Sequence, residues 1–204
     1  VGGLSQPGKM SCYGLGIPAD YCRTGSKLRE IENSVCSDCY ALKGNYRFTN
    51  VTAAQERRYR IITAVLDSGR WSQRWRDYVN AFSVLLSRES HFRVHDSGDL
   101  ISLLHLFLWF DIAEANPHCG IWIPTKELTT IRKAHNIPSN VTIRYSAPML
   151  DTVTTSWFPN SATYHNPESA AHGFKCPAPL QGNACVRCRA CWDNTVATVI
   201  YKKH

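Results

Sequence analysis

The distribution of cysteine constrains this chain more than any other feature of the sequence. Four of its nine cysteines lie near the start, four lie near the end, and Cys119 stands alone between the two groups. The first group is Cys12, Cys22, Cys36 and Cys39, and the second is Cys176, Cys185, Cys188 and Cys191. An odd count in a chain of 204 residues that starts without a signal-peptide pattern disfavours a secreted disulfide framework. The grouping instead predicts metal sites.

The C-terminal group has the spacing C-x8-C-x2-C-x2-C, and its first cysteine, Cys176, is followed by proline. Three thiolates at consecutive x2 gaps can each reach a different iron of a compact cluster, and the more distant Cys176 then supplies the fourth ligand. Structural zinc sites more often use two separated C-x2-C pairs, or cysteine with histidine. The pattern therefore favours a [4Fe–4S] cluster, with zinc as the alternative, and a purely structural role remains open.

In the N-terminal group, Cys36 and Cys39 have the C-x2-C spacing of a metal knuckle, and Cys22 and Cys12 are candidate partners upstream. A site that uses all four cysteines would be closed. A site that uses only Cys22, Cys36 and Cys39 would leave one coordination position for a substrate or cofactor. Both arrangements stay open, so the sequence predicts one or two clusters.

Between the cysteine groups, apolar patterning and turn signals predict alternating helices and strands. Strands are expected at 91–95, 120–124 and 141–145, with a last strand at 196–201. Helices are expected from an Asn50 cap to Asp67, from Ser72 through Leu85, over 102–115 and over 126–135. Alternation of this kind implies parallel strands joined by right-handed crossovers. The predicted fold is one α/β domain, 1–204, forming a partial (β/α) barrel or an open parallel sheet. Its centre, 50–150, is flanked by cysteine-rich, loop-rich segments at 1–49 and 151–204, and the chain after Asp151 is expected to be irregular up to the last strand.

Polar residues follow the predicted strands, at the sheet edge where parallel α/β proteins bind ligands. The residues predicted to be catalytic are His95, Asp96, Asp99, Lys126 and Glu127. The residues predicted to line a cofactor pocket are Ser97, Gly98 and Arg144. The alternative for the first turn is that its aspartates only cap the next helix.

A formal net charge of +7 is compatible with a polyanionic partner, and six arginines gather between Arg57 and Arg76. They predict either a nucleic-acid contact or a solvated helix face. No apolar run approaches the length of roughly 18 residues that a membrane span requires, so no membrane partner is expected. Neither a Gly-x-Ser-x-Gly elbow nor a phosphate-binding P-loop is present.

Several runs of the sequence are similar to one known family. They are Gly25-Ser26-Lys27-Leu28, Val35 to Gly44, His95 to Leu100, Pro124 to Glu127 and Cys188 to Asp193. In combination they resemble the phage family called gene product eighty-eight. That resemblance implies a phage or prophage origin, and therefore the cytoplasm of an infected bacterium, but it implies no particular chemistry.

A looser similarity is to radical S-adenosylmethionine enzymes, which place a three-cysteine cluster before a partial (β/α) barrel. It implies that Cys22, Cys36 and Cys39 bind the open cluster, that the 97–99 turn lies near S-adenosylmethionine, and that the C-terminal cysteines hold an auxiliary cluster. Two features depart from the usual pattern of those enzymes. Thirteen residues separate Cys22 from Cys36, and Asp38 stands where an aromatic residue is usual. Two other functions compete with an enzyme acting on a small molecule: a metal-stapled nucleic-acid-binding protein, and a host-interaction protein without catalysis.

Overall fold

All seven strands of the sheet run parallel, in the order β1-β2-β3-β4-β5-β7-β6. The computed structural model describes residues 1–203. The strands are β1 (Gly14–Leu15), β2 (His91–Val94), β3 (Gly120–Thr125), β4 (Val141–Ser146), β5 (Asn160–Tyr164), β6 (Phe174–Lys175) and β7 (Thr198–Lys202). From β1 to β5 each strand lies beside the next in the chain, which is the winding of a (β/α) barrel, but β1 and β6 are the two end strands and the sheet stays open.

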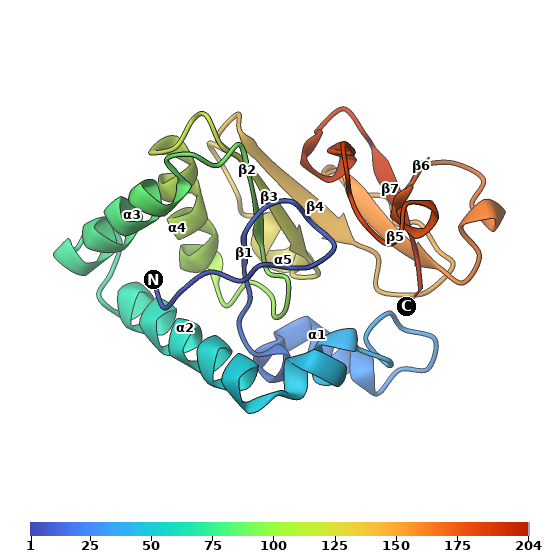
Figure 1. The fold of residues 1–204 in the computed structure, drawn as a ribbon, viewed down its shortest axis with the longest axis horizontal. Coiled ribbons are helices and arrows are strands. Elements are labelled where there is room, and N and C mark those ends of the chain that lie inside the picture. The colour runs from blue at the N-terminus through green and yellow to red at the C-terminus, as the bar shows by residue number, and fades with distance from the viewer. Residues whose placement is uncertain (204) are drawn as a thin grey trace.

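In Figure 1 the longer helices gather on one side of strands β1 to β4, and the first helix lies below these strands. The helices are α1 (Arg23–Arg29), α2 (Thr49–Asp67), α3 (Gln73–Leu86), α4 (Leu103–Glu114) and α5 (Leu128–Ile131). Single 3₁₀ turns are found at Ala19–Tyr21, Tyr40–Leu42, Gly44–Arg47, Pro167–Ser169, Ala178–Leu180 and Ala190–Trp192. None of the helices in residues 1–203 is both long enough and apolar enough to cross a bilayer.

One face of the sheet is apolar and forms the main core. Phe92, Ile121 and Ile143 project from three neighbouring strands and are at most 2% exposed. They belong to the same buried cluster as Phe82 of α3 and Trp109 of α4, whose rings pack edge to face with centroids 5.2 Å apart. Successive residues of a strand point to opposite faces, so the residues between these apolar ones lie on the other face.

The opposite face of strands β2 to β4 carries larger polar and aromatic side chains. Arg93 pairs in register with Trp122, and Trp122 pairs with Thr142. The C-terminal cysteine segment packs onto this face through Trp192, whose indole N–H donates to the Phe92 carbonyl at 2.9 Å. The two faces of the sheet therefore have different uses: one packs against helices, and the other meets the cysteine-rich end of the chain.

The predicted α/β class is confirmed, and so are the three central strands and two helix starts. Ser72 and Ser102 each accept a hydrogen bond from the backbone N–H three residues later, at 3.1 and 3.2 Å. The predicted Asn50 cap is wrong, because α2 begins one residue earlier and the residue before it is Phe48. The predicted 126–135 helix is also too long, since α5 covers only four residues.

The expectation of irregular chain after Asp151 is wrong for β5, which pairs with β4 and β7. Its sequence, Asn-Ser-Ala-Thr-Tyr, lacks an apolar alternation, and its polar residues Ser161 and Thr163 line a pocket. Strands β1 and β6 and helix α1 were not predicted either. Each strand has only two residues, and α1 contains Thr, Gly and Ser, which are weak helix formers.

Candidate functional site

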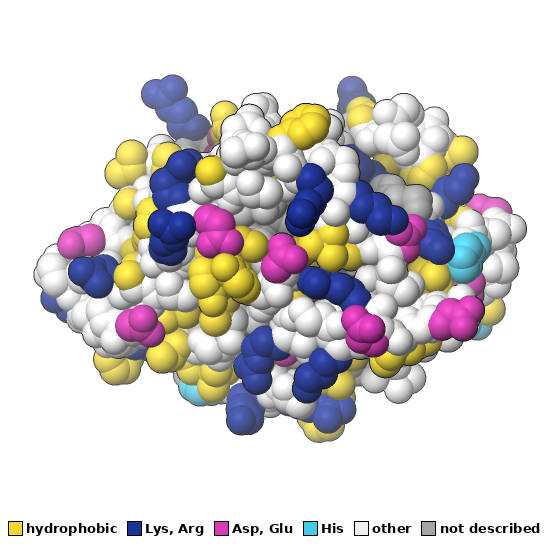
Figure 2. Space-filling model, turned by 90° about the horizontal axis from the view of Figure 1, so that it is seen from below, with side chains coloured by type: hydrophobic (Ala, Val, Ile, Leu, Met, Phe, Trp, Pro, Cys, Tyr) yellow, Lys and Arg dark blue, Asp and Glu magenta, His cyan; other side chains and the backbone are white. Residues whose placement is uncertain are grey.

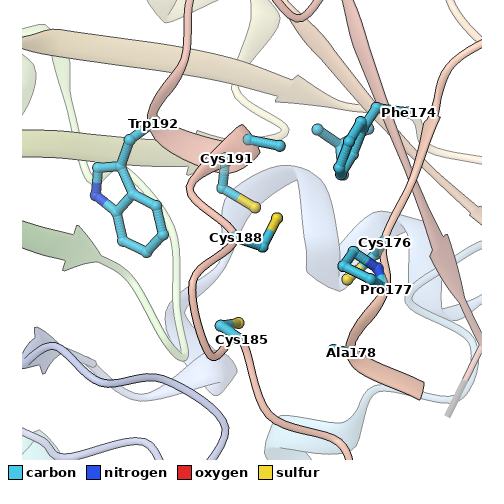
Figure 3. A pocket seen from close by; sticks show the side chains of 10 residues that line it. Phe174, Cys176, Pro177, Ala178, Cys185, Cys188, Cys191 and Trp192 are labelled. Atoms are coloured by element: carbon cyan, nitrogen blue, oxygen red, sulfur yellow. The ribbon is translucent and has the colours of Figure 1, made fainter. Parts of the chain in front are cut away.

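The four C-terminal cysteines line one small cavity. Cys176 follows β6, and the other three, Cys185, Cys188 and Cys191, lie on the segment that leads to β7. In Figure 3 their sulfur atoms point toward a shared space from two separate stretches of chain. The fold therefore brings together every cysteine of the predicted C-terminal site.

Backbone hydrogen bonds from distant segments fix this group. The Cys176 N–H donates to the Ile200 carbonyl, and the Cys185 N–H donates to the Lys9 carbonyl, both at 2.8 Å. The Cys191 sulfur lies 3.0 Å from the Tyr201 hydroxyl. Burial raises the pKa of the Cys191 thiol to about 11, so a metal would have to displace its proton to bind there.

Arg144 of β4 anchors the loop that carries Cys191. Its side chain is completely buried. Its guanidinium donates to the carbonyls of Asn160, Ala190, Asp193 and Val196 at 2.9–3.0 Å, with a longer contact to Cys191 at 3.5 Å. The predicted role of Arg144 in binding a cofactor stays a prediction, but the contacts that it makes hold the cysteine loop on the sheet.

Cys22, Cys36 and Cys39 form the second group, on the long connection that follows β1. A Cβ atom at Gly25 would lie 3.7 Å from the Cys22 sulfur and 3.6 Å from the Cys36 sulfur, so both sulfurs lie beside the same position of helix α1. The charges of Cys36 and Cys39 both raise the pKa of Cys22, though burial raises it more. These three side chains are therefore neighbours.

Contacts with the strand ends hold the N-terminal group in place. The buried Glu127, which follows β3, accepts a hydrogen bond from the Thr24 N–H at 2.8 Å, next to Cys22. Ser34 forms a bridge with Met149, beyond the end of β4. The Tyr40 hydroxyl donates to the Asp96 carbonyl at 2.7 Å. Glu127 was predicted to be catalytic; the contact seen here positions a cysteine.

Cys12 is apart from the other N-terminal cysteines. It is 8% exposed, and the charges that act on it are those of Arg93, Arg189, Cys185 and Glu89. Burial raises its pKa to about 11. Among residues 1–203, no three His, Cys, Asp or Glu side chains are spaced to hold one metal ion. The geometry thus places a three-cysteine group at one end of the molecule's polar face and a four-cysteine group at the other.

A pocket of about 410 Å³ lies between the two cysteine groups. Val35, Asp38 and Tyr40 of the N-terminal cysteine loop form one wall, and Cys185 and Cys191 belong to the opposite wall. Strand residues that line its floor are Arg93, Trp122, Pro124, Ser146, Ser161, Thr163 and Tyr201. This volume lies within the range of small-molecule sites, roughly 300–1,000 Å³.

The turn after β2 contributes only some of its side chains to this pocket. His95, Gly98 and Asp99 line it. Asp96 instead accepts a hydrogen bond from the Ser5 hydroxyl at 2.9 Å, and the Ser97 hydroxyl donates to the Ile17 carbonyl at 2.9 Å. The turn therefore both ties the N-terminal segment to the sheet and presents three residues to the pocket.

Asp99 and Lys126 meet at the rim between β2 and β3. The Asp99 carboxylate accepts hydrogen bonds from the Thr125 hydroxyl at 2.5 Å and from the Lys126 and Leu100 N–H groups at 2.9 and 2.7 Å. Burial raises the pKa of Asp99 to about 6 despite these hydrogen bonds. The Lys126 side chain also lines the pocket. A carboxyl and an ammonium group are thus available where the sequence predicts catalytic residues.

His95 is held in an unusual state. Its φ of 59° is in the left-handed region, it is 3% exposed, and neither ring nitrogen has a hydrogen-bond partner. Burial, the neighbouring His105 and Arg93 hold the pKa of His95 well below its ordinary value. Backbone strain and unsatisfied buried nitrogens are uncommon in native structures and often mark a functional position.

The buried His105 should make the stability of the protein sensitive to acid. Burial lowers its pKa to about 3 from 6.5, and its Nε2 accepts a hydrogen bond from the Trp109 indole at 3.1 Å. The unfolded chain takes up a proton as pH falls through 6.5 and the folded chain does not. The neutral His105 therefore stabilises the folded protein fully above pH 6.5, and this stabilisation is lost as the pH falls toward 3. The free energy of unfolding should fall by about 1.5 kcal/mol between pH 6.5 and pH 5.

Urea unfolding at pH 7, 6 and 5 checks this expectation. His105→Gln keeps an acceptor for Trp109 and should lose less stability on acidification than the unmodified protein. His135→Gln, at an exposed position, is the control and should retain the full pH dependence. If the free energy of unfolding changed equally with pH in the unmodified protein and in His105→Gln, His105 would not be the source of the acid sensitivity.

A family model described as Gene product 88 matches residues 2–194. The chain belongs to the phage family Gene product 88. No curated protein and no solved structure matches the chain.

The Gene product 88 match includes both cysteine groups and most of the pocket. It ends before β7, so Tyr201, Lys202 and Lys203 of the pocket wall lie outside the matched residues. The family match confirms the resemblance drawn from the cysteine-containing runs. It says nothing about a similarity to radical S-adenosylmethionine enzymes.

Several pocket residues of this Gene product 88 protein were not among the predicted site residues. The most prominent are Arg93 and Trp122, at paired positions on β2 and β3. A signal for both is present, because each stands between apolar residues of a strand and so must lie on the face opposite the core. The pocket residues on β5 gave no comparable signal, since β5 was not predicted.

Proposed function

We propose that this protein is an iron–sulfur enzyme of redox or radical type that acts on a small molecule in the pocket between its two cysteine groups. The C-terminal four cysteines hold a fully ligated [4Fe–4S] cluster. Cys22, Cys36 and Cys39 hold a second cluster with one open position, for which S-adenosylmethionine is the candidate ligand. The observation that carries the proposal is that one 410 Å³ pocket is lined by residues from both cysteine-bearing segments.

The donor set of the C-terminal group supports a cluster. Four thiols surround a common space in Figure 3. One zinc ion would require all four sulfurs to lie about 2.3 Å from a single point. In a cluster each thiolate binds a different iron, so the sulfurs stay further apart and encircle the inorganic core. The C-x2-C-x2-C run with the more distant Cys176 matches the second arrangement better than the two separated C-x2-C pairs common in zinc sites.

The position of the N-terminal group supports an open site. Three cysteines follow β1 and lie at the carboxyl ends of the strands, beside the pocket, whereas Cys12 interacts with Cys185 and Arg93 instead. When bound, such clusters supply single electrons. The residues of the chain itself would bind and orient the substrate: Lys126 and Arg93 offer positive charge, and Asp99 fixes the backbone at Lys126.

Nine free cysteines suit a reducing compartment, and we place the protein in the cytoplasm of the infected cell. The alternative, a metal-stapled nucleic-acid-binding protein, has less support. Arg58 is buried against the Gly16 carbonyl, and Arg70 pairs with Asp111 at 2.7 Å. On the face that Figure 2 shows, Lys and Arg side chains are interspersed with Asp and Glu and form no continuous basic patch.

The test is anaerobic purification followed by analysis of iron, sulfide and zinc. Two clusters predict about eight irons and eight sulfides per chain, with zinc absent. Adding S-adenosylmethionine to the reduced protein should change the electron paramagnetic resonance spectrum of one cluster. Cys36→Ser should abolish this change and remove about half of the iron.

Each alternative has its own outcome. Zinc without sulfide would reject the iron–sulfur proposal and make the cysteine groups structural. About eight irons with no spectral response to S-adenosylmethionine would reject the radical-type version and leave a redox role. Binding to DNA with a steep salt dependence, in a protein that holds zinc, would favour the nucleic-acid alternative.

A further inference from the structure

Arg93 forms no ion pair, although its side chain is partly buried; the Asp96 carboxylate acts on it only at longer range and accepts its hydrogen bond from Ser5 instead. Its guanidinium carbon lies 4.9 Å from the Trp122 ring centroid, and its N–H groups reach the Tyr40 hydroxyl at 3.4 Å and the Met10 sulfur at 3.9 Å. Its Nε is buried without a hydrogen-bond partner. The ion pairs of residues 1–203 are Lys43–Asp38, Arg70–Asp111, His165–Asp151 and Lys175–Glu168, and none includes Arg93.

Arg144 provides an internal comparison on a neighbouring strand of the same sheet. It is completely buried and places its donors on backbone carbonyls at 2.9–3.5 Å. Arg93 has no such set of acceptors. The Tyr40 hydroxyl and the more distant Asp96 compensate the charge of Arg93 in part. An anion from outside the chain would supply the close charged acceptor that Arg93 lacks.

The charged residues that line the pocket also favour an anionic ligand. Its basic residues are Lys9, Arg93, Lys126, Lys202 and Lys203, and its acidic residues are Asp38 and Asp99. Asp38 is paired with Lys43. The Asp99 carboxylate accepts hydrogen bonds from the Thr125 hydroxyl and from two backbone N–H groups. Neither acid neutralises Arg93.

Unsatisfied polar atoms concentrate at this pocket. Six buried side-chain nitrogen or oxygen atoms in residues 1–203 lack a partner, and four of them belong to Arg93, His95 and Trp122. All three residues line the pocket, and His95 and Trp122 are each 3% exposed. Buried unsatisfied groups are few in native structures, and their gathering in one place indicates a binding site.

We infer that this pocket binds a small organic anion, a carboxylate or a phosphate ester, with Arg93 as the receptor for the charged group. The Trp122 indole N–H provides a further hydrogen bond, and the aromatic walls accept an apolar or aromatic body. A volume of about 410 Å³ admits a small molecule. The inference gives the substrate class for the pocket of the proposed function, but the argument from Arg93 does not depend on a metal.

The experiment measures binding of phenyl phosphate, benzoate and the neutral benzyl alcohol by calorimetry at constant ionic strength. We expect at least one anion to bind and benzyl alcohol to bind at least tenfold more weakly. Arg93→Gln should weaken the anion at least roughly tenfold, because removing a buried charge partner has effects of that size. Arg60→Gln makes the same charge change at an exposed site on α2 and should bind as the unmodified protein does.

Arg93→Lys keeps the charge but loses the planar fork, so it should bind the anion with intermediate affinity. It also provides the test if Arg93→Gln does not fold. The inference is overturned if neither anion binds the unmodified protein, if Arg93→Gln, or Arg93→Lys in its place, binds as tightly, or if Arg60→Gln weakens binding equally. Iron and sulfide are measured on the same samples. Iron without anion binding would reject this inference alone, and anion binding without iron or sulfide would reject only the proposed function.

Discussion

Replacing Cys188 with serine is expected to remove the C-terminal cluster and about half of the iron and sulfide. Cys188 is the cleanest choice within the group, because its sulfur makes no hydrogen bond within residues 1–203 while that of Cys191 contacts Tyr201. Serine has nearly the same shape as cysteine. If the partly exposed Cys188 held no metal, its replacement by serine would lower the free energy of unfolding by less than about 1 kcal/mol. Metal ligation contributes on the order of 10 kcal/mol to small metal-bound segments. We therefore expect a loss of several kcal/mol in the free energy of unfolding.

Iron, sulfide and urea unfolding are measured together for Cys188→Ser and for a control, Cys119→Ala. Cys119 is completely buried in the main core and lies outside both cysteine groups. Its replacement should lower stability by roughly 1 kcal/mol through lost packing and leave the iron content unchanged. Full iron content in Cys188→Ser, with unchanged stability, would show that this cysteine is not a ligand.

The central strands were predictable because each has one apolar face. Phe92 and Ile121 alternate with Arg93 and Trp122, so the period-two pattern survives in the sequence. Strand β5 has small polar residues on its pocket face and only Ala162 and Tyr164 as buried apolar residues, and the pattern fails there. The first strand is too short to carry any periodicity. Its place in the sheet depends on pairing with β2, which is a tertiary interaction.

The cysteine groups were predictable from spacing, but the roles of single polar residues were not. Sequence reasoning treated His95, Asp96 and Asp99 alike, whereas only His95 and Asp99 face the pocket. The two strand arginines show the same limit. Arg93 and Arg144 each lie on a strand between apolar residues, yet Arg144 is surrounded by carbonyls of a loop about 50 residues away in the chain. No local pattern specifies where that loop will pack.

Replacing Arg144 with methionine is expected to release that loop from the sheet. Methionine has a similar length and no donors, so the carbonyls of Asn160, Ala190, Asp193 and Val196 would each lose a hydrogen bond while enclosed. Each buried acceptor that is left without a partner costs about 1–3 kcal/mol, so the free energy of unfolding should fall by at least about 3 kcal/mol. Because Cys191 lies within the released segment, iron should also be lost faster from the C-terminal group than from the N-terminal one.

The measurements are urea unfolding and the rate at which a chelator removes iron. Arg132→Met, at an exposed position beyond α5, removes the same charge and should change stability by less than about 0.5 kcal/mol. Arg144→Lys keeps a buried charge but replaces the planar five-donor fork with one ammonium group. Its free energy of unfolding should therefore lie between those of Arg144→Met and Arg132→Met. If Arg144→Met loses stability but releases iron at the unmodified rate, the arginine supports the sheet without positioning Cys191. If both quantities follow Arg144, the loop and the C-terminal metal site form one unit that is fastened to the sheet by a single side chain.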